Sequence, residues 1–195
     1  MMTPKILITN DDGINSPGIY ALWEAMCEVG EPVIVAPVKE QSATSHAITL
    51  SQPVSIKAVS RSCGFKGWSV NGTPVDCAKI GIKTLLNQKP NLIISGINSG
   101  ANLGANLIYS GTLSAAAEGA FLGIPSIAIS LASLKTDDFR ASKHIAIKMA
   151  KALMGNAGRL LIRKSGTESK IRIMGESHDK KLILECIKMV KKSIK

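Results

Sequence analysis

Short apolar runs alternate along this sequence with segments of helical periodicity, and this alternation constrains the fold more than any other feature. The apolar runs cover residues 5–9, 32–36, 91–95 and 125–131, with a brief further candidate at 68–70. Helical spacing of apolar residues follows Ser16-Pro17, Thr73-Pro74 and Thr112, and spans about 138–153. Buried parallel strands have such apolar runs, and serine or threonine before proline is typical of a helix start. The pattern predicts an α/β fold with a mostly parallel sheet.

The expected architecture is a Rossmann-like three-layer sandwich, in which ligands bind beyond the carboxyl ends of the strands. Three polar loops leave strand ends there, at residues 9–16, 37–49 and 95–112. The first strand is not followed by G-x-G-x-x-G, and no G-K-[ST] of a Walker loop occurs. We therefore expect neither a dinucleotide-binding site nor a Walker-type nucleotide site.

The net charge of +10 is confined to the C-terminal third. Residues 1–134 hold eight basic and eight acidic residues, whereas residues 135–195 hold 16 basic and six acidic ones. A nucleic-acid partner could use this excess, but a solvated basic helix face is the commoner cause, so we expect no nucleic-acid partner. No apolar run reaches 18 residues, and acidic residues follow the first apolar run too early for a signal peptide. We expect a cytoplasmic protein with no membrane partner.

The first polar loop carries two adjacent carboxylates, in Asn10-Asp11-Asp12-Gly13. Neighbouring carboxylates repel unless protons or a cation neutralise them, and hard divalent ions such as Mg²⁺ or Mn²⁺ favour oxygen ligands. Taken alone, this motif is more often a polar turn. The other two loops add hydroxyls, amides and one imidazole, His46. Ser110-Gly111-Thr112 also runs into a helix start, where free backbone amides attract phosphate.

These loops together resemble the SurE family of 5′/3′-nucleotidases. The matching segments are ILITNDDGINSPGI at 6–19, VIVAPVKEQSATSHAITL at 33–50, VNGTPVDCAKIGI at 70–82 and LIISGINSGANLGANLIYSGTLSAAAEGAFLGIPSIAIS at 92–130. The resemblance implies a phosphatase or nucleotidase, a hydrolase that uses one divalent cation per chain, magnesium or manganese, to hydrolyse nucleoside monophosphates.

The same resemblance implies the roles of individual residues. The metal ligands would be Asp11, Asp12, Ser42 and Asn98, with Asp11 and Asn98 also catalytic. The substrate phosphate would contact Asn10, Ser110, Gly111 and Thr112. His46 could act as an acid or base, or could be a surface or structural histidine.

The end of the chain resembles a different family. GRLLIRKSGTESKIRIMGES at 158–177 is similar to the last domain of phosphohexomutases, especially phosphoglucosamine mutase. That resemblance implies a phosphate loop made of Arg163, Ser165, Gly166 and Thr167. We therefore expect a phosphatase domain at 1–154 and a small β–β–α unit at 155–195, joined near 154–158.

Two functions stay open at this point. The first is a metal-dependent phosphatase with a replaced tail. The second is a non-catalytic nucleotide- or phosphosugar-binding protein, should the replaced extension uncover or misshape the site. We expect at most a homodimer in place of the family's tetramer, because the exchanged extension of the family is not found in this sequence.

Overall fold

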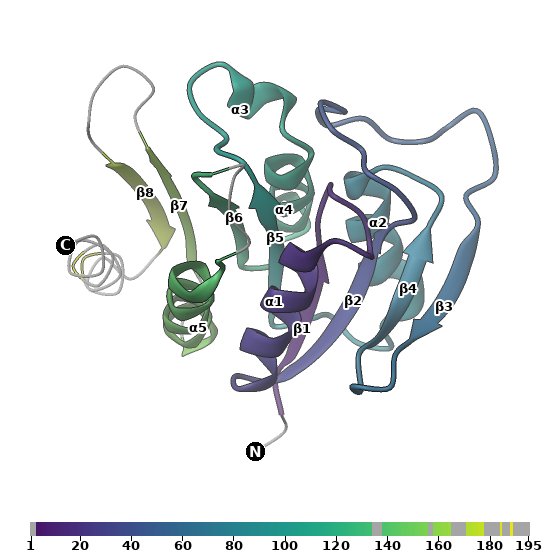
Figure 1. Cartoon of the computed structure of the whole chain (residues 1–195), viewed down its shortest axis with the longest axis horizontal. Coiled ribbons are helices and arrows are strands. Elements are labelled where there is room, and N and C mark those ends of the chain that lie inside the picture. The colour runs from purple at the N-terminus through teal and green to yellow at the C-terminus, as the bar shows by residue number, and fades with distance from the viewer. Residues whose placement is uncertain are drawn as a thin grey trace.

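A computed structural model of the chain describes residues 3–133, 138–155, 158–164 and 171–177, together with the single residues 184 and 188. Within them lies a six-stranded mixed sheet of order β3-β4-β2-β1-β5-β6 (Figure 1). Its strands are β1 (Lys5–Thr9), β2 (Glu31–Pro37), β3 (Ile56–Ser60), β4 (Lys66–Val70), β5 (Leu92–Ser99) and β6 (Ser126–Leu131). All neighbours pair in parallel except β3 with β4. The expected α/β fold with a mostly parallel sheet is confirmed.

Helices cover both faces of this sheet. They are α1 (Pro17–Cys27), α2 (Pro74–Ile80), α3 (Asn106–Tyr109), α4 (Gly111–Phe121) and α5 (Arg140–Gly155), with a π-helical turn η1 (Gly81–Leu85) after α2. One buried cluster joins Ile6 and Ile8 of β1 to residues of α1 and α5. A second cluster joins Leu7 of the same strand to Cys77 of α2 on the opposite face. The alternation of β1 thus places one apolar layer on each side of the sheet.

The helix starts follow the capping chemistry that the sequence predicts. The Ser16 hydroxyl accepts a hydrogen bond from the Ile19 amide at 3.4 Å, with Pro17 in the first turn of α1. Thr73 and Asp76 form a reciprocal capping box at the start of α2. Both helices therefore begin at the expected residues.

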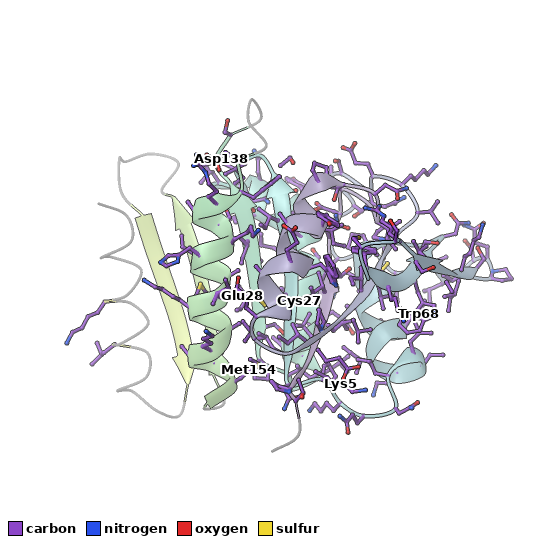
Figure 2. All side chains as sticks on the ribbon, turned by 60° about the horizontal axis from the view of Figure 1, so that its bottom comes forward. Lys5, Cys27, Glu28, Trp68, Asp138 and Met154 are labelled. Carbon is purple, nitrogen blue, oxygen red and sulfur yellow. The ribbon has the colours of Figure 1, made fainter. Side chains whose placement is uncertain are left out.

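The strand order places a topological switch point between β1 and β5. From β1 the chain moves outward through β2 to β4, and it later returns to β5 on the other side of β1. The loops that leave β1 and β5 therefore separate at the carboxyl edge of the sheet, where ligands of open α/β folds bind. Figure 2 shows Asp138 and Met154 at opposite ends of α5. This helix therefore begins near the carboxyl edge of the sheet and runs along it toward the other edge.

The C-terminal part contains an antiparallel pair, β7 (Gly158–Lys164) and β8 (Ile171–Ser177), in which Arg163 pairs with Arg172. The two expected strands of this part are thus present, and β7 lies next to β6 (Figure 1). The expected final helix and the Ser165–Thr167 segment fall outside the described residues. No helix in the described ranges is both long and apolar enough to cross a bilayer.

Candidate metal and phosphate site

The loop that follows β1 is folded around a buried asparagine. Asn10 is fully buried, and its amide nitrogen donates to the Gly13 carbonyl at 3.0 Å and to the Ser16 hydroxyl at 2.8 Å. Gly13 has a φ of +94°, and a Cβ there would lie 3.1 Å from the Lys39 carbonyl carbon. Glycine is therefore needed both for the turn and for the close approach of the second loop.

Asp11 is buried against the start of α4. Its Oδ1 accepts a hydrogen bond from the Thr112 hydroxyl at 2.5 Å. A Cβ on Gly111 would lie 2.8 Å from the Asp11 Cβ, so only glycine allows the helix to approach this carboxylate so closely. Burial raises the pKa of Asp11 above its ordinary value, against the lowering effect of the Thr112 hydroxyl.

Asp12 lies beside the end of β5. Its Oδ2 accepts the backbone N–H of Ser99 at 3.1 Å. Burial, and to a smaller extent the neighbouring charges of Asp11 and Glu40, raise the pKa of Asp12 to about 6. Ionising both adjacent carboxylates is thus unfavourable unless a positive charge lies next to them.

The second loop is tied to the first by backbone hydrogen bonds. The Ile14 amide donates to the Pro37 carbonyl at 2.8 Å, and the Gln41 amide donates to the Asp11 carbonyl at 2.7 Å. Ser42 follows directly, is exposed, and donates its hydroxyl hydrogen to the Glu40 carboxylate. The predicted ligand Ser42 is therefore brought to the same edge of the sheet as the two aspartates.

Asn98 completes the predicted ligand set from β5. The pairing of β5 with β6 shifts register between Ser95 and Asn98, so the strand is irregular just before this residue. The Asn98 amide nitrogen donates to the Gly100 carbonyl at 2.8 Å. Its carbonyl oxygen is then the side-chain atom available to a cation.

The donor set fits a hard divalent cation. Asp11 and Asp12 supply two carboxylates, Asn98 an amide carbonyl and Ser42 a hydroxyl, which are the oxygen ligands that Mg²⁺ and Mn²⁺ take. In the part of the chain that the structure describes, no three His, Cys, Asp or Glu side chains cluster as a metal site. The fit therefore depends on two carboxylates with neutral oxygens, and softer nitrogen or sulfur ligands do not contribute.

Some of the predicted phosphate residues already have hydrogen-bond partners within the chain. Ser110 caps α4 by accepting the Leu113 amide at 3.2 Å, and α4 is an 11-residue helix whose first turn adjoins Asp11. The Thr112 hydroxyl is engaged by Asp11, and the Asn10 amide is engaged inside its own loop. The Leu113 amide, the Asn10 amide and the Thr112 hydroxyl thus all have partners within the chain, which leaves Ser110 and Gly111 as the candidate phosphate contacts at the start of α4.

His46 is held away from the two aspartates. Its Nε2 lies 2.9 Å from the Glu118 carboxylate, about two turns along α4 from the helix start. The Lys79 ammonium donates to the other oxygen of Glu118 at 2.9 Å. Of the two roles left open for His46, this geometry favours the structural one, an anchor for the end of the second loop.

Several residues that organise the site were not predicted from the sequence. Glu118 and Lys79 anchor His46, and Asp76 accepts the Thr49 hydroxyl at 2.6 Å and the Thr49 amide at 3.0 Å. Asp76 is thus both the capping partner of Thr73 and an anchor of the second loop. Nothing in local periodicity indicates the partner of Glu118, since His46 lies 72 residues away.

The expected phosphate loop of the tail cannot be placed in this site. Ser165, Gly166 and Thr167 lie outside the described residues. Arg163 lies in β7, where its backbone position is defined by the pairing with Arg172.

Known proteins share both the sequence and the fold of this chain. The sequence model of one family, described as survival protein SurE, matches residues 6–176. A 5'-nucleotidase SurE of Syntrophus aciditrophicus (strain SB) is 49% identical over 150 residues, which cover 77% of this chain and 56% of that protein. Another, of Nitratidesulfovibrio vulgaris (strain DP4), is 47% identical over 144 residues, covering 73% of this chain and 57% of that protein. The chain thus spans a little over half the length of these curated relatives.

A solved structure extends the similarity to the whole fold. The crystal structure of the SurE protein from Aquifex aeolicus matches with a TM-score of 0.74 at 30% identity, over 91% of this chain and 86% of that chain. The family match continues to residue 176, past the expected join near 154–158 and across β7 and β8. No similarity found here supports the expected resemblance of 158–177 to phosphohexomutases.

Proposed function

The chain belongs to the SurE family, and from that premise we propose that it is a metal-dependent phosphatase that hydrolyses nucleoside monophosphates. The observation that supports the proposal is that Asp12 accepts the amide of Ser99, the neighbour of Asn98, while the Asp11 carbonyl accepts the amide of Gln41, the neighbour of Ser42, beside the start of α4. The curated relatives are named 5'-nucleotidases, which agrees with this chemistry.

In the proposed reaction the protein mainly holds charge and orients groups. Asp11, Asp12, Ser42 and Asn98 would hold a divalent cation such as Mg²⁺ or Mn²⁺, which supplies polarisation of a phosphoryl oxygen and a bound water of lowered pKa. The Thr112 hydroxyl holds the Asp11 carboxylate, and the Ser99 amide holds the Asp12 carboxylate. At the start of α4, Gly111 and the Ser110 hydroxyl would contact phosphate oxygens and orient the ester bond.

Phosphate release from AMP and GMP tests the proposal. The chelator-treated protein should release no phosphate, and activity should return with added Mg²⁺ or Mn²⁺. The Asp11→Asn variant should stay inactive under the same conditions. The proposal fails if no nucleoside monophosphate is hydrolysed at saturating metal.

The second candidate is a non-catalytic nucleotide- or phosphosugar-binding protein, which would use the same oxygen ligands and phosphate contacts without turnover. Calorimetry with AMP distinguishes the two functions, because binding without hydrolysis supports only the second. The same preparation can be examined by light scattering for the expected homodimer, and by cell fractionation for the expected cytoplasmic location.

A further inference from the structure

Glu40 lies in the loop after β2, next to the candidate site. It is not one of the proposed metal ligands or phosphate contacts, so its role is still open. The backbone at Lys39 and Glu40 packs against Gly13, where a Cβ would approach the Glu40 nitrogen to 3.3 Å. The Gln41 amide, one residue further, donates to the Asp11 carbonyl at 2.7 Å. Glu40 is therefore held next to the aspartate loop by contacts on both sides of it.

One observation connects the Glu40 carboxylate to the proposed ligands. The Ser42 hydroxyl donates to Glu40 Oε1. Glu40 thus places a negative charge beside the one hydroxyl in the set and accepts its hydrogen.

Glu40 does not lie where a third carboxylate ligand would lie. Within the described residues, Asp11, Asp12 and Glu40 are not grouped closely enough to count as a three-residue metal site. Its contact with the ligand set is through Ser42.

A serine hydroxyl has one hydrogen to donate and two lone pairs. If the hydrogen points at the cation, the hydroxyl repels it. A carboxylate that accepts this hydrogen leaves the lone pairs for the cation and makes the oxygen a stronger ligand, as outer-shell carboxylates do for other metal ligands.

We propose that Glu40 is a positioning residue that orients the Ser42 hydroxyl toward the divalent cation and strengthens it as a ligand. This inference rests on the proposed function, because it assumes a cation among Asp11, Asp12, Ser42 and Asn98. It assigns the glutamate no contact with substrate.

Titration of Mn²⁺ into the chelator-treated full chain, followed by calorimetry, tests the role without any turnover. Four variants are compared with the parent chain: Glu40→Gln, Ser42→Ala, the double variant, and Glu31→Gln as the matched control. Glu31 is an exposed glutamate at the start of β2, at the opposite edge of the sheet, so the control removes the same charge far from the site.

Glu40→Gln should weaken Mn²⁺ binding by up to about tenfold and by no more than Ser42→Ala does, because it acts through that hydroxyl, and Glu31→Gln should leave the affinity unchanged. In the Ser42→Ala background the same change should cost less than about threefold, because the hydroxyl that Glu40 orients is gone. The Glu40→Asp variant, which keeps the carboxylate, should recover part of the loss. At saturating Mn²⁺ the KM for AMP should not change.

Parent-like Mn²⁺ affinity in Glu40→Gln would overturn the inference. An equal loss in the presence and absence of the Ser42 hydroxyl would also overturn it, because Glu40 would then act by its charge alone. Both results leave the phosphatase proposal intact if the parent chain hydrolyses AMP. A parent chain that binds Mn²⁺ without hydrolysis sinks the phosphatase proposal and leaves the Glu40 test valid, whereas a parent chain that binds no Mn²⁺ overturns both.

Discussion

The two sides of the candidate metal site are held in different ways. On the carboxylate side, made of Asp11 and Asp12, each side chain accepts a hydrogen bond from a distant segment, Thr112 or Ser99, and Asp11 is only 6% exposed. On the hydroxyl side, made of Glu40 and Ser42, both side chains are exposed and bond to each other. The two carboxylates proposed as ligands are thus held by segments distant in sequence, whereas the proposed hydroxyl ligand bonds to one neighbour in its own loop.

The loop of the hydroxyl side is nevertheless anchored at its far end. Ala43 and Ser45 have φ angles of 56° and 54°, which non-glycine residues adopt only where the surroundings hold them. The Ser45 amide donates to the Tyr109 carbonyl at 3.0 Å, and its hydroxyl donates to the Ile108 carbonyl at 2.9 Å. The backbone of the loop is therefore held both before and after Ser42. Only the exposed side chains of Glu40 and Ser42 are left free to change conformation.

The largest effect is expected on the carboxylate side. Asp11→Asn keeps the shape of the side chain but removes one ligand charge. Since loss of an outer-shell partner weakens metal binding by about 10–100-fold, loss of a charged ligand should weaken it at least about 100-fold, with a similar loss of turnover. Mn²⁺ calorimetry and phosphate release measure both. The control is Asp138→Asn, because Asp138 is an exposed aspartate paired with Arg140. If Asp11→Asn binds Mn²⁺ like the parent chain, Asp11 is not a ligand.

Thr112→Val tests how much the hydrogen bond that holds the Asp11 carboxylate contributes, because Asp11 itself stays in place. The variant keeps the volume of the side chain and removes the hydroxyl that donates to Asp11 across 101 residues of sequence. Mn²⁺ affinity should fall about 10-fold, with Asp11 still present. Ser114→Ala, which removes a hydroxyl of the same helix that donates to the Ser110 carbonyl instead, should bind Mn²⁺ like the parent. If only the KM for AMP changes in Thr112→Val, the hydroxyl serves phosphate and the comparison of the two sides weakens.

A smaller effect is expected from Ser42→Ala on the hydroxyl side. The ligand is neutral and exposed, so water can replace it, and a net interaction of about 0.5–1.5 kcal/mol corresponds to a loss of affinity of about tenfold or less. The same Mn²⁺ titration measures this loss. A decrease as large as that of Asp11→Asn would show that both sides are equally fixed.

The smallest effect concerns the anchor of the loop and depends on pH. Burial raises the pKa of Glu118, but hydrogen bonds from Lys79 and His46 outweigh it, so the pKa is lowered overall. A carboxyl group with a lowered folded-state pKa stabilises the fold above its unfolded pKa of about 4.3, and the stabilisation is lost as the pH falls through the folded value. Glu118→Gln should therefore lower the free energy of unfolding by about 1 kcal/mol at pH 7, and this difference should shrink as the pH falls through the lowered folded-state pKa of Glu118.

Urea unfolding of the parent chain and of Glu118→Gln at several pH values measures this difference. Glu24→Gln, which removes an exposed partner of Lys143, is the control and should show little change at any pH. A difference between parent and Glu118→Gln that does not depend on pH would mean that the Glu118 charge does not anchor the loop.

Much of the fold could be predicted from the sequence because local patterns carry it. The apolar runs gave the buried strands of the sheet, and the caps at Ser16 and Thr73 gave the starts of α1 and α2. β3 was missed because it is an edge strand whose residues are mostly exposed, so it has no apolar run. The phosphohexomutase resemblance came from a short motif, and the family match to residue 176 gives that motif no support.

The sequence by itself determined which chemical groups stand at the ends of the strands, since the order of strands and polar loops is local information. Only the tertiary structure decided which partner each group takes. The Thr112 hydroxyl could serve phosphate or Asp11, the Asn10 amide could face a ligand or its own loop, and His46 could be an acid, a base or an anchor. Each choice is a competition between hydrogen-bond partners, which for Thr112 and His46 lie far apart in sequence, and packing settles it by fixing which partner comes within about 3 Å.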